Sequence, residues 1–216
     1  VGVNVAADPL FTLAYTGVKG GLVLVSADDP GMHSSQNEQD NRYYAFVNRI
    51  PMLEPTNSQE AKDFVGIALD LSERFDTPVL LRATTRVCHS QSLVDTKERV
   101  EKQVPAYAKD PQKYVMLPAF ARLRRLKVEE RINALKEYAD QCELNEIQWG
   151  DKKIGIIASG IAYQYAKEAV PYASFLKLGL TNPLPMKMIK DFVEKVDKLY
   201  VVEELSPFIE DQLKSW

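Results

Sequence analysis

The loop that follows residue 27 holds most of the side chains in this chain that could do acid–base or ligand-binding chemistry. It comes after a continuous apolar run, residues 21–27, and it extends to about residue 44 with little periodicity. In open α/β sheets, ligands bind outside the carboxyl ends of the strands, and this loop leaves such an end. The candidate site residues in it are Asp28, Asp29, His33, Ser34, Ser35 and Gln36. The same composition equally suits a solvated surface loop.

A second group of candidates follows the next apolar run, residues 78–81. It consists of Thr85, Arg86 and His89. Arg86 could grip a carboxylate or phosphate through its bidentate guanidinium, or it could form an ion pair with the acidic loop. His33 and His89 are the two histidines of the chain, and both come just after a predicted strand. They could converge on one sheet edge as acid–base groups or ligand donors, while a structural role suits each equally.

Other polar groups give weaker indications of a site. Cys88 and His89 are adjacent, so on an extended chain their side chains point apart and mutual activation is not expected. A basic cluster around residues 122–127 suits a solvated face, or a contact with an acidic neighbouring subunit, better than nucleic acid, because no aromatic residues alternate with the charges. Ser159-Gly160 lies between a predicted strand and a helix, where it could hold an anion or form a tight turn.

The elements that position these residues alternate along the chain. In the first part, the pattern predicts a helix over 8–18, capped by Asp8, and a second helix that Ser58 caps and that extends to about Leu71. Between and after them it predicts a central strand over 21–27, a short strand over 50–55 and a strand from 78 to 81. Such alternation is typical of a parallel α/β sheet.

The second part repeats this architecture after a less periodic stretch. Residues 92–126 mix charges of both signs with prolines and suggest a linker, followed by a helical stripe from Val128 to Cys142. Strands are predicted over 154–158, 175–178 and 199–203, and helices over 160–170, 186–196 and after Ser206. The pattern indicates a second, small doubly wound sheet.

Composition limits the class of protein. The chain has 216 residues, 45% of them hydrophobic and 26% charged, as expected for a globular protein with a sizeable core. No apolar run approaches the ~20 residues of a membrane span. The net charge of −3 argues against nucleic acid as a partner. Two cysteines make neither a disulfide framework nor a metal cage, so we expect a reducing, cytoplasmic compartment. The first residues lack a signal-peptide pattern and suggest a fragment of a longer protein.

Several long stretches resemble the alpha subunit of indolepyruvate ferredoxin oxidoreductase, a member of the thiamine-diphosphate-dependent 2-oxoacid:ferredoxin oxidoreductase family. They are GLVLVSADDPGMHSSQNEQDNRYYA, PMLEPTNSQEAKDFV, PVLLRATTRVCHSQ, KYVMLPAFAR and LGLTNPLPMKMIKDFVEKVDKLYVVEEL. Together they cover essentially the whole chain. The resemblance implies an α/β fold with the C-terminal part of a pyrimidine-binding domain over 1–91. It further implies a linker with one amphipathic helix over 92–151 and a transketolase C-terminal-like domain over 152–216.

The resemblance also implies an activity. Family members decarboxylate an aryl 2-oxoacid oxidatively to aryl-acetyl-CoA, as expected in anaerobic metabolism. Their cofactors are thiamine diphosphate with Mg²⁺ and [4Fe-4S] clusters, and their partners are a beta subunit, ferredoxin, coenzyme A and the aryl pyruvate substrate. By analogy we expect a dimer or heteromer.

The chain departs from the family pattern because three motifs of the family are not in its sequence. The activating glutamate, the Gly-Asp-Gly motif for diphosphate and Mg²⁺, and the cluster-binding Cys-x-x-Cys runs are not in this sequence. The isolated chain should therefore be inactive, and no catalytic residue is assigned. By the resemblance, the loop residues named above face the cofactor and substrate region, and Thr85, Arg86 and His89 end the last strand beside it. The alternative is a non-catalytic scaffold or interface module of a thiamine-enzyme complex.

Overall fold

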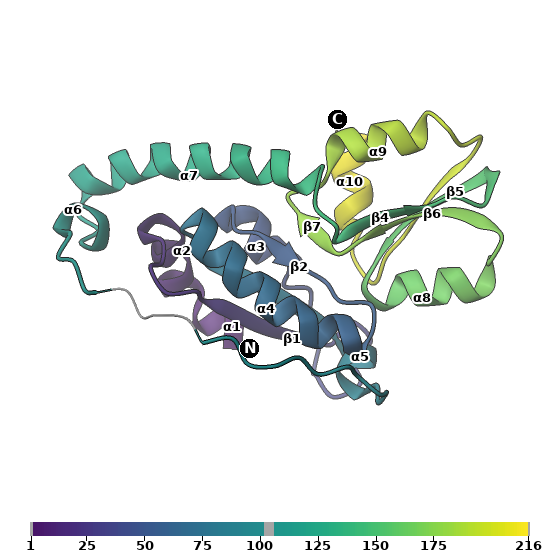
Figure 1. Ribbon diagram of the computed structural model, residues 1–216, viewed down its shortest axis with the longest axis horizontal. Helices are drawn as coiled ribbons and strands as arrows, with labels where there is room; N and C mark the ends of the chain where they lie inside the picture. Colours follow the sequence, from purple (N-terminus) through teal and green to yellow (C-terminus); the bar gives the residue numbers. More distant parts are fainter. Residues whose placement is uncertain (1, 102–105, 216) are drawn as a thin grey trace.

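The computed structural model describes residues 2–101 and 106–215, which form two four-stranded sheets with flanking helices (Figure 1). The first sheet has the strand order β1-β3-β2-β7 and the second has the order β4-β6-β5-β8. Parallel pairing dominates within each sheet. The predicted α/β fold class with two parallel-sheet units is therefore confirmed.

The first sheet is built around three parallel strands. β1 (Val23–Asp28) pairs with β3 (Val79–Thr84), which pairs with β2 (Met52–Leu53). The prediction that the first apolar run is a central strand was wrong, because β1 lies at the sheet edge and the Val25 side chain is 62% exposed. An apolar run indicates a strand, but it carries no information on how many strands flank it.

Five helices accompany this sheet in the described residues: α1 (Gly2–Val5), α2 (Ala7–Thr16), α3 (Arg42–Asn48), α4 (Ser58–Phe75) and α5 (Thr85–His89). α3 was not predicted, because its Tyr43, Phe46 and Val47 remain partly exposed and give no buried stripe. The predicted caps were also wrong. Asn57, one residue before Ser58, accepts the amide of Glu60 at the start of α4, and α2 has no side-chain cap from Asp8.

The stretch predicted to be a linker contains the longest helix of the described chain. After the short α6 (Pro111–Tyr114), α7 runs over Pro118–Ala139 along the top of the view in Figure 1. The predicted stripe is buried from Val128 to Ala139, but the helix begins ten residues earlier than the stripe. The first turns of α7 escaped prediction because Leu123 and Leu126 point to solvent. No helix in the described ranges is both long and apolar enough to cross a membrane.

The second sheet has three parallel strands and one antiparallel edge strand. β5 (Asp151–Ser159) pairs in parallel with β6 (Ala173–Leu178) and β8 (Leu199–Val202), and β4 (Asn145–Gln148) runs antiparallel to β6. α8 (Gly160–Ala169) packs on one face through Tyr163. α9 (Met186–Val193) and α10 (Phe208–Lys214) cover the other face (Figure 1). β4 was not predicted, and α10 follows Pro207 without a cap from Ser206.

One strand ties the two sheets together. β7 (Leu180–Asn182) follows β6 directly but pairs antiparallel with β2 of the first sheet. The buried side chain of Asn145 holds this crossing: its Oδ1 accepts the amides of Gly179 and Leu180 at 3.0 Å, and its amide donates to the Ala139 carbonyl. The division into units at residues 91 and 151 stays a prediction.

Replacing Asn145 tests the importance of this crossing. Asn145→Ala removes three buried hydrogen bonds, each worth about 1 kcal/mol. The Gly179 amide keeps the Leu144 carbonyl as a partner, and the Ala139 carbonyl keeps the Cys142 thiol. We therefore expect the free energy of unfolding to fall by about 2–4 kcal/mol in urea titrations of the full-length protein. The control is Asn133→Ala, a substitution of an exposed residue on α7. Equal stability of the two variants would contradict this role.

Candidate functional site

The carboxyl ends of strands from both sheets meet at one place, which we call the carboxyl-end junction. From the first sheet it contains Asp28 at the end of β1, Glu54 after β2 and Thr84 at the end of β3. From the second it contains Ser159 at the end of β5 and Glu203 after β8. The Ser159 hydroxyl donates to Glu54 Oε2 at 3.4 Å. Ligands of α/β proteins bind at such strand ends, so this junction is the candidate functional site.

Arg82 is the cation on the first-sheet side of the junction, where it pairs with two carboxylates. This β3 residue is 3% exposed, and its Nε donates to Asp28 Oδ2 at 2.6 Å while its Nη1 donates to Glu54 Oε1 at 2.5 Å. Asp28 also accepts from the Ser26 hydroxyl and from the Asn41 side chain. Burial alone would lower the pKa of Arg82, but the charges of Glu54 and Asp28 outweigh it and raise that pKa.

Arg42 joins the two sheets. It is 1% exposed at the start of α3, and it forms a bidentate pair with Asp40 at 2.6 and 2.8 Å. Its Nη1 donates to Glu203 Oε2 at 2.7 Å, and its Nη2 donates to the carbonyls of Glu204 and Ser206. Burial of Asp40 would raise its pKa, but the hydrogen bonds and charge of Arg42 lower it. Such buried ions are tolerable because each is paired and hydrogen-bonded.

Glu204 adds a further carboxyl group to the junction. Burial raises its pKa, and the neighbouring Thr84 and Arg82 oppose that shift only in part. The next residue, Leu205, has φ +69°, a left-handed conformation that is uncommon for a residue with a side chain. The turn after β8 therefore holds an acid of raised pKa beside the end of β3.

Asp29 shapes the loop after β1. Its carboxylate accepts the backbone amides of His33, Ser34 and Ser35 at 2.7–2.9 Å, and the Thr85 hydroxyl at 2.9 Å. The amides of Ser34 and His33 are the main reason why the pKa of Asp29 lies far below its ordinary value. The carboxylate thus acts as an internal anion that ties the loop after β1 to the end of β3.

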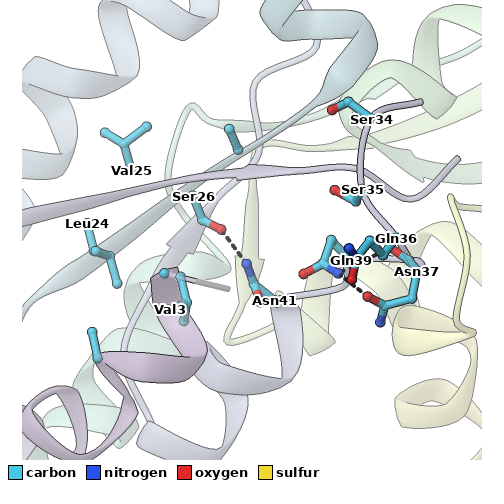
Figure 2. Close-up of a pocket in the computed structure, with 13 residues that line it drawn as sticks. Val3, Leu24, Val25, Ser26, Ser34, Ser35, Gln36, Asn37, Gln39 and Asn41 are labelled. Atoms are coloured by element: carbon cyan, nitrogen blue, oxygen red, sulfur yellow. Dashed lines mark hydrogen bonds between the residues drawn. The ribbon is translucent and has the colours of Figure 1, made fainter. Parts of the chain in front are cut away.

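The other predicted site residues fall into two groups. Ser34, Ser35 and Gln36 line a cleft of about 680 Å³ beside the edge strand β1 (Figure 2). Arg86 and His89 are exposed on α5, and His33 is exposed with its ring over Gly31. The structure therefore joins Asp29, Thr85 and residues 33–35 by hydrogen bonds. In the described ranges, Arg86 makes no ion pair with the acidic loop.

The cleft itself is lined by uncharged groups. Figure 2 shows Leu24 and Val25 of β1 on one side, Val3 of α1 below, and Gln36, Asn37 and Gln39 on the other side. The Asn41 amide donates to the Ser26 hydroxyl across the base. Amides and hydroxyls on an open strand edge can hydrogen-bond a neutral polar group.

The remaining candidates play smaller parts. Within the described residues, no three His, Cys, Asp or Glu side chains are grouped so as to hold a metal ion. Burial raises the pKa of the Cys88 thiol, and the Asp28 charge raises it further, so the thiolate nucleophile is disfavoured. In the basic cluster, Arg124 binds Asp76 and the Tyr15 carbonyl, Arg125 pairs with Glu129, and Lys127 pairs with Glu130.

Residues that the sequence analysis missed carry the charge of the junction. They are Asp40, Arg42, Glu54, Arg82, Glu203 and Glu204. One signal was available, because Arg82 and Glu54 each interrupt an apolar strand segment, and a charge in such a segment indicates a buried partner. The partners lie far away in sequence and could not be identified by spacing.

Comparison with known proteins places this site in context. No family model matches the chain. It is 45% identical over 216 residues to the indolepyruvate oxidoreductase subunit IorA of Archaeoglobus fulgidus, covering 97% of this chain and 35% of that protein. It is 41% identical over 228 residues to the subunit IorA of Pyrococcus abyssi, covering 100% of this chain and 35% of that protein.

Solved structures agree on the fold. The 2-oxoglutarate:ferredoxin oxidoreductase from Magnetococcus marinus aligns with a TM-score of 0.69 at 12% identity, covering 99% of this chain and 46% of that one. A split gene transketolase aligns with a TM-score of 0.53 at 14% identity, covering 97% of this chain and 60% of that one.

The chain therefore shares the fold of the matching part of that 2-oxoacid:ferredoxin oxidoreductase. Its sequence confirms the predicted resemblance to the alpha subunit of indolepyruvate oxidoreductases, the IorA subunits, over nearly the whole chain. The chain spans about a third of the length of these curated relatives.

Removing Arg42 should destabilise the protein strongly. Arg42→Ala leaves buried Glu203 without its cation and leaves Asp40 only the longer contact with Arg82, at 3.7 Å, so the free energy of unfolding should fall by about 3–5 kcal/mol. Urea titration of the full-length protein measures it. The exposed Arg122→Ala should stay within about 0.5 kcal/mol of the parent. A loss for Arg42→Ala no larger than this would contradict the proposed junction.

The hydrogen bonds between the Asp29 carboxylate and the loop after β1 should persist over a wide pH range. Because folding lowers the pKa of Asp29, its stabilising contribution is complete above the unfolded value of about 4 and is lost only as pH falls through the folded value. Amide hydrogen exchange of Ser34 and Ser35, corrected for its intrinsic pH dependence, should show constant protection from pH 8 to 5. Asp29→Asn should exchange faster at every pH, whereas Glu38→Gln in the same loop should not. Equal protection in both variants would refute the role of Asp29.

Proposed function

We propose that this chain forms part of the alpha subunit of an aryl pyruvate:ferredoxin oxidoreductase. The observation that carries the proposal is identity of 40–45% to IorA subunits over nearly the whole chain. The carboxyl-end junction supports it, because strand ends of two sheets face one another there, as a shared ligand site requires.

The proposed reaction is an oxidative decarboxylation. The bond between C1 and C2 of an aryl 2-oxoacid breaks and carbon dioxide leaves. Two electrons pass to ferredoxin, and the acyl group passes to the thiol of coenzyme A. Thiamine diphosphate, when bound, supplies the electron sink for the decarboxylation, and iron–sulfur clusters carry the electrons.

The described residues do not fit the charged parts of these cofactors. No metal-binding group is present among them, and the cradle of backbone amides at residues 33–35 is already filled by the Asp29 carboxylate. Mg²⁺, the diphosphate and the clusters are therefore assigned to residues outside this chain.

This chain's own residues would shape and line the substrate region. Asp28 and Asp29 hold the loop, so that Ser34, Ser35, Gln36 and His33 present polar groups next to the end of β3. The exposed guanidinium of Arg86 would pair with the substrate carboxylate, and His33 or His89 would hydrogen-bond the oxoacid or an intermediate.

The proposal also covers partners and compartment. The alpha subunit would assemble with a beta subunit as a dimer or heteromer and would react with ferredoxin and coenzyme A. Both cysteines in the structure are free thiols, which favours a cytoplasmic location. The predicted boundaries at residues 91 and 151 would separate a pyrimidine-binding part from a transketolase C-terminal-like part.

One observation favours the scaffold alternative. The carboxylates of Asp28 and Asp29 already accept hydrogen bonds from donors of this chain. In that case residues 28–36 would hold an interface between cofactor-binding domains and would take no part in substrate binding.

Substitutions on the exposed site residues separate these two functions. In the full enzyme complex, Arg86→Ala and His33→Ala should each cut viologen reduction by an aryl pyruvate and coenzyme A by at least about tenfold, the cost of one charge-assisted contact. For Arg86→Ala, KM for the aryl pyruvate should rise, because its carboxylate loses its partner.

The exposed Arg122→Ala on α7 is the matched control and should retain the parent rate. Full activity of both site variants would overturn the site assignment and favour the scaffold. A complex that releases the aldehyde without reducing the dye would overturn the oxidoreductase assignment.

A further inference from the structure

A second cavity, of about 500 Å³, lies between α3, α7, the segment after β7, and α10. It shares no lining residue with the cleft beside β1. Its volume lies in the range of small-molecule sites, about 300–1,000 Å³. We call it the α3–α10 cavity.

The walls of this cavity are largely apolar and come from distant parts of the chain. Ile132 of α7 and Leu184 after β7 are buried behind it, while Phe46 and Val47 of α3 are 48% and 58% exposed at its opening. Met186, at the start of α9, adds a thioether to the same wall. Apolar side chains gathered around an open hollow are typical of a site for an apolar group.

Two cations stand at the edge of the apolar walls. Arg49 donates hydrogen bonds from one guanidinium nitrogen, Nη1, to both carboxylate oxygens of Glu129, at 2.5 and 2.6 Å. The same carboxylate also pairs with Arg125, so one negative charge is shared by two guanidinium groups. Lys136, one turn further along α7 from Ile132, has no side-chain partner in the described ranges. The edge of the cavity therefore carries excess positive charge.

The backbone at Arg49 supports a functional reason for its position. The residue caps α3 with φ +57°, a left-handed conformation in which a glycine would be less strained. Non-glycine residues in this conformation cluster at ligand sites. Here the conformation places a guanidinium on the cavity edge, where glycine would leave none.

We propose that the α3–α10 cavity binds a small organic monocarboxylate whose body is a single aromatic ring or a branched alkyl group. The carboxylate lies between Arg49 and Lys136, and the apolar body packs against Phe46, Ile132 and Leu184. An anion without an apolar body would leave these walls exposed, and a neutral apolar molecule would leave Lys136 without a counter-charge.

Such a ligand would touch elements that accompany the first sheet and elements that accompany the second. α3 and α7 belong to the first group, and the start of α9 together with Gln212 of α10 belongs to the second. A bound carboxylate would therefore favour the arrangement in which Arg42 reaches Glu203. This inference concerns binding and does not depend on the proposed activity.

Calorimetric titration of the full-length protein with phenylacetate tests the proposal. We expect saturable binding, about tenfold or more tighter than that of the uncharged analogue phenylacetamide. Lys136→Gln should weaken phenylacetate binding by about tenfold, since it removes one of two cations from the carboxylate. Lys190→Gln, a similarly exposed lysine on α9 outside the cavity lining, should leave it unchanged.

A second variant probes the opening without disturbing the core. Val47→Asp places a negative charge at an exposed helix position beside the proposed carboxylate and should abolish binding. Absence of saturable binding to the parent would overturn the proposal. Equal affinity for acid and amide, or phenylacetate binding that neither Lys136→Gln nor Val47→Asp weakens, would also overturn it, because the ligand would then occupy another site.

Discussion

Two buried guanidinium groups hold the structure together at the point where its two sheets meet. Arg82 forms ion pairs with Asp28 and Glu54, and Arg42 forms ion pairs with Asp40 and Glu203. Charges removed from water must be paired and hydrogen-bonded, since an isolated one costs several kcal/mol. Asp28, Glu54 and Glu203 therefore each depend on an arginine from another segment, and these segments must stay in register.

The fold supplies the geometry that this pairing needs. β7 leaves the second sheet and pairs with β2 of the first, and Asn145 holds the crossing. The carboxyl ends of β1, β2 and β3 can then face those of β5 and β8. The loop after β1 is anchored twice, through Asn41 to Asp28 and through Asp29 to Thr85. The site and the contact between the sheets are thus stabilised by the same interactions.

The sequence predicted elements that depend on local pattern and missed those that depend on distant contacts. Apolar runs of strand length located β1, β3, β5 and β6, because burial of such runs is a local requirement. The edge position of β1 and the existence of α3 depend on tertiary packing, and neither could be predicted locally. The predicted position of the candidate loop, directly after a strand, is confirmed, whereas its role as a site stays a prediction. Glu203, the partner of Arg42 in the second sheet's half, lies 161 residues away, so no spacing could have identified it.

A double-mutant cycle on Arg42 and Glu203 tests the central claim, that buried ion pairs join the two sheets. The free energies of unfolding of Arg42→Ala, Glu203→Ala and the double variant are compared with the parent in the full-length protein. We predict a coupling energy of about 2 kcal/mol or more, as expected for a buried, hydrogen-bonded pair. The exposed Lys127–Glu130 pair should give about 0.5 kcal/mol or less. A coupling no larger than that of the exposed pair would contradict the account.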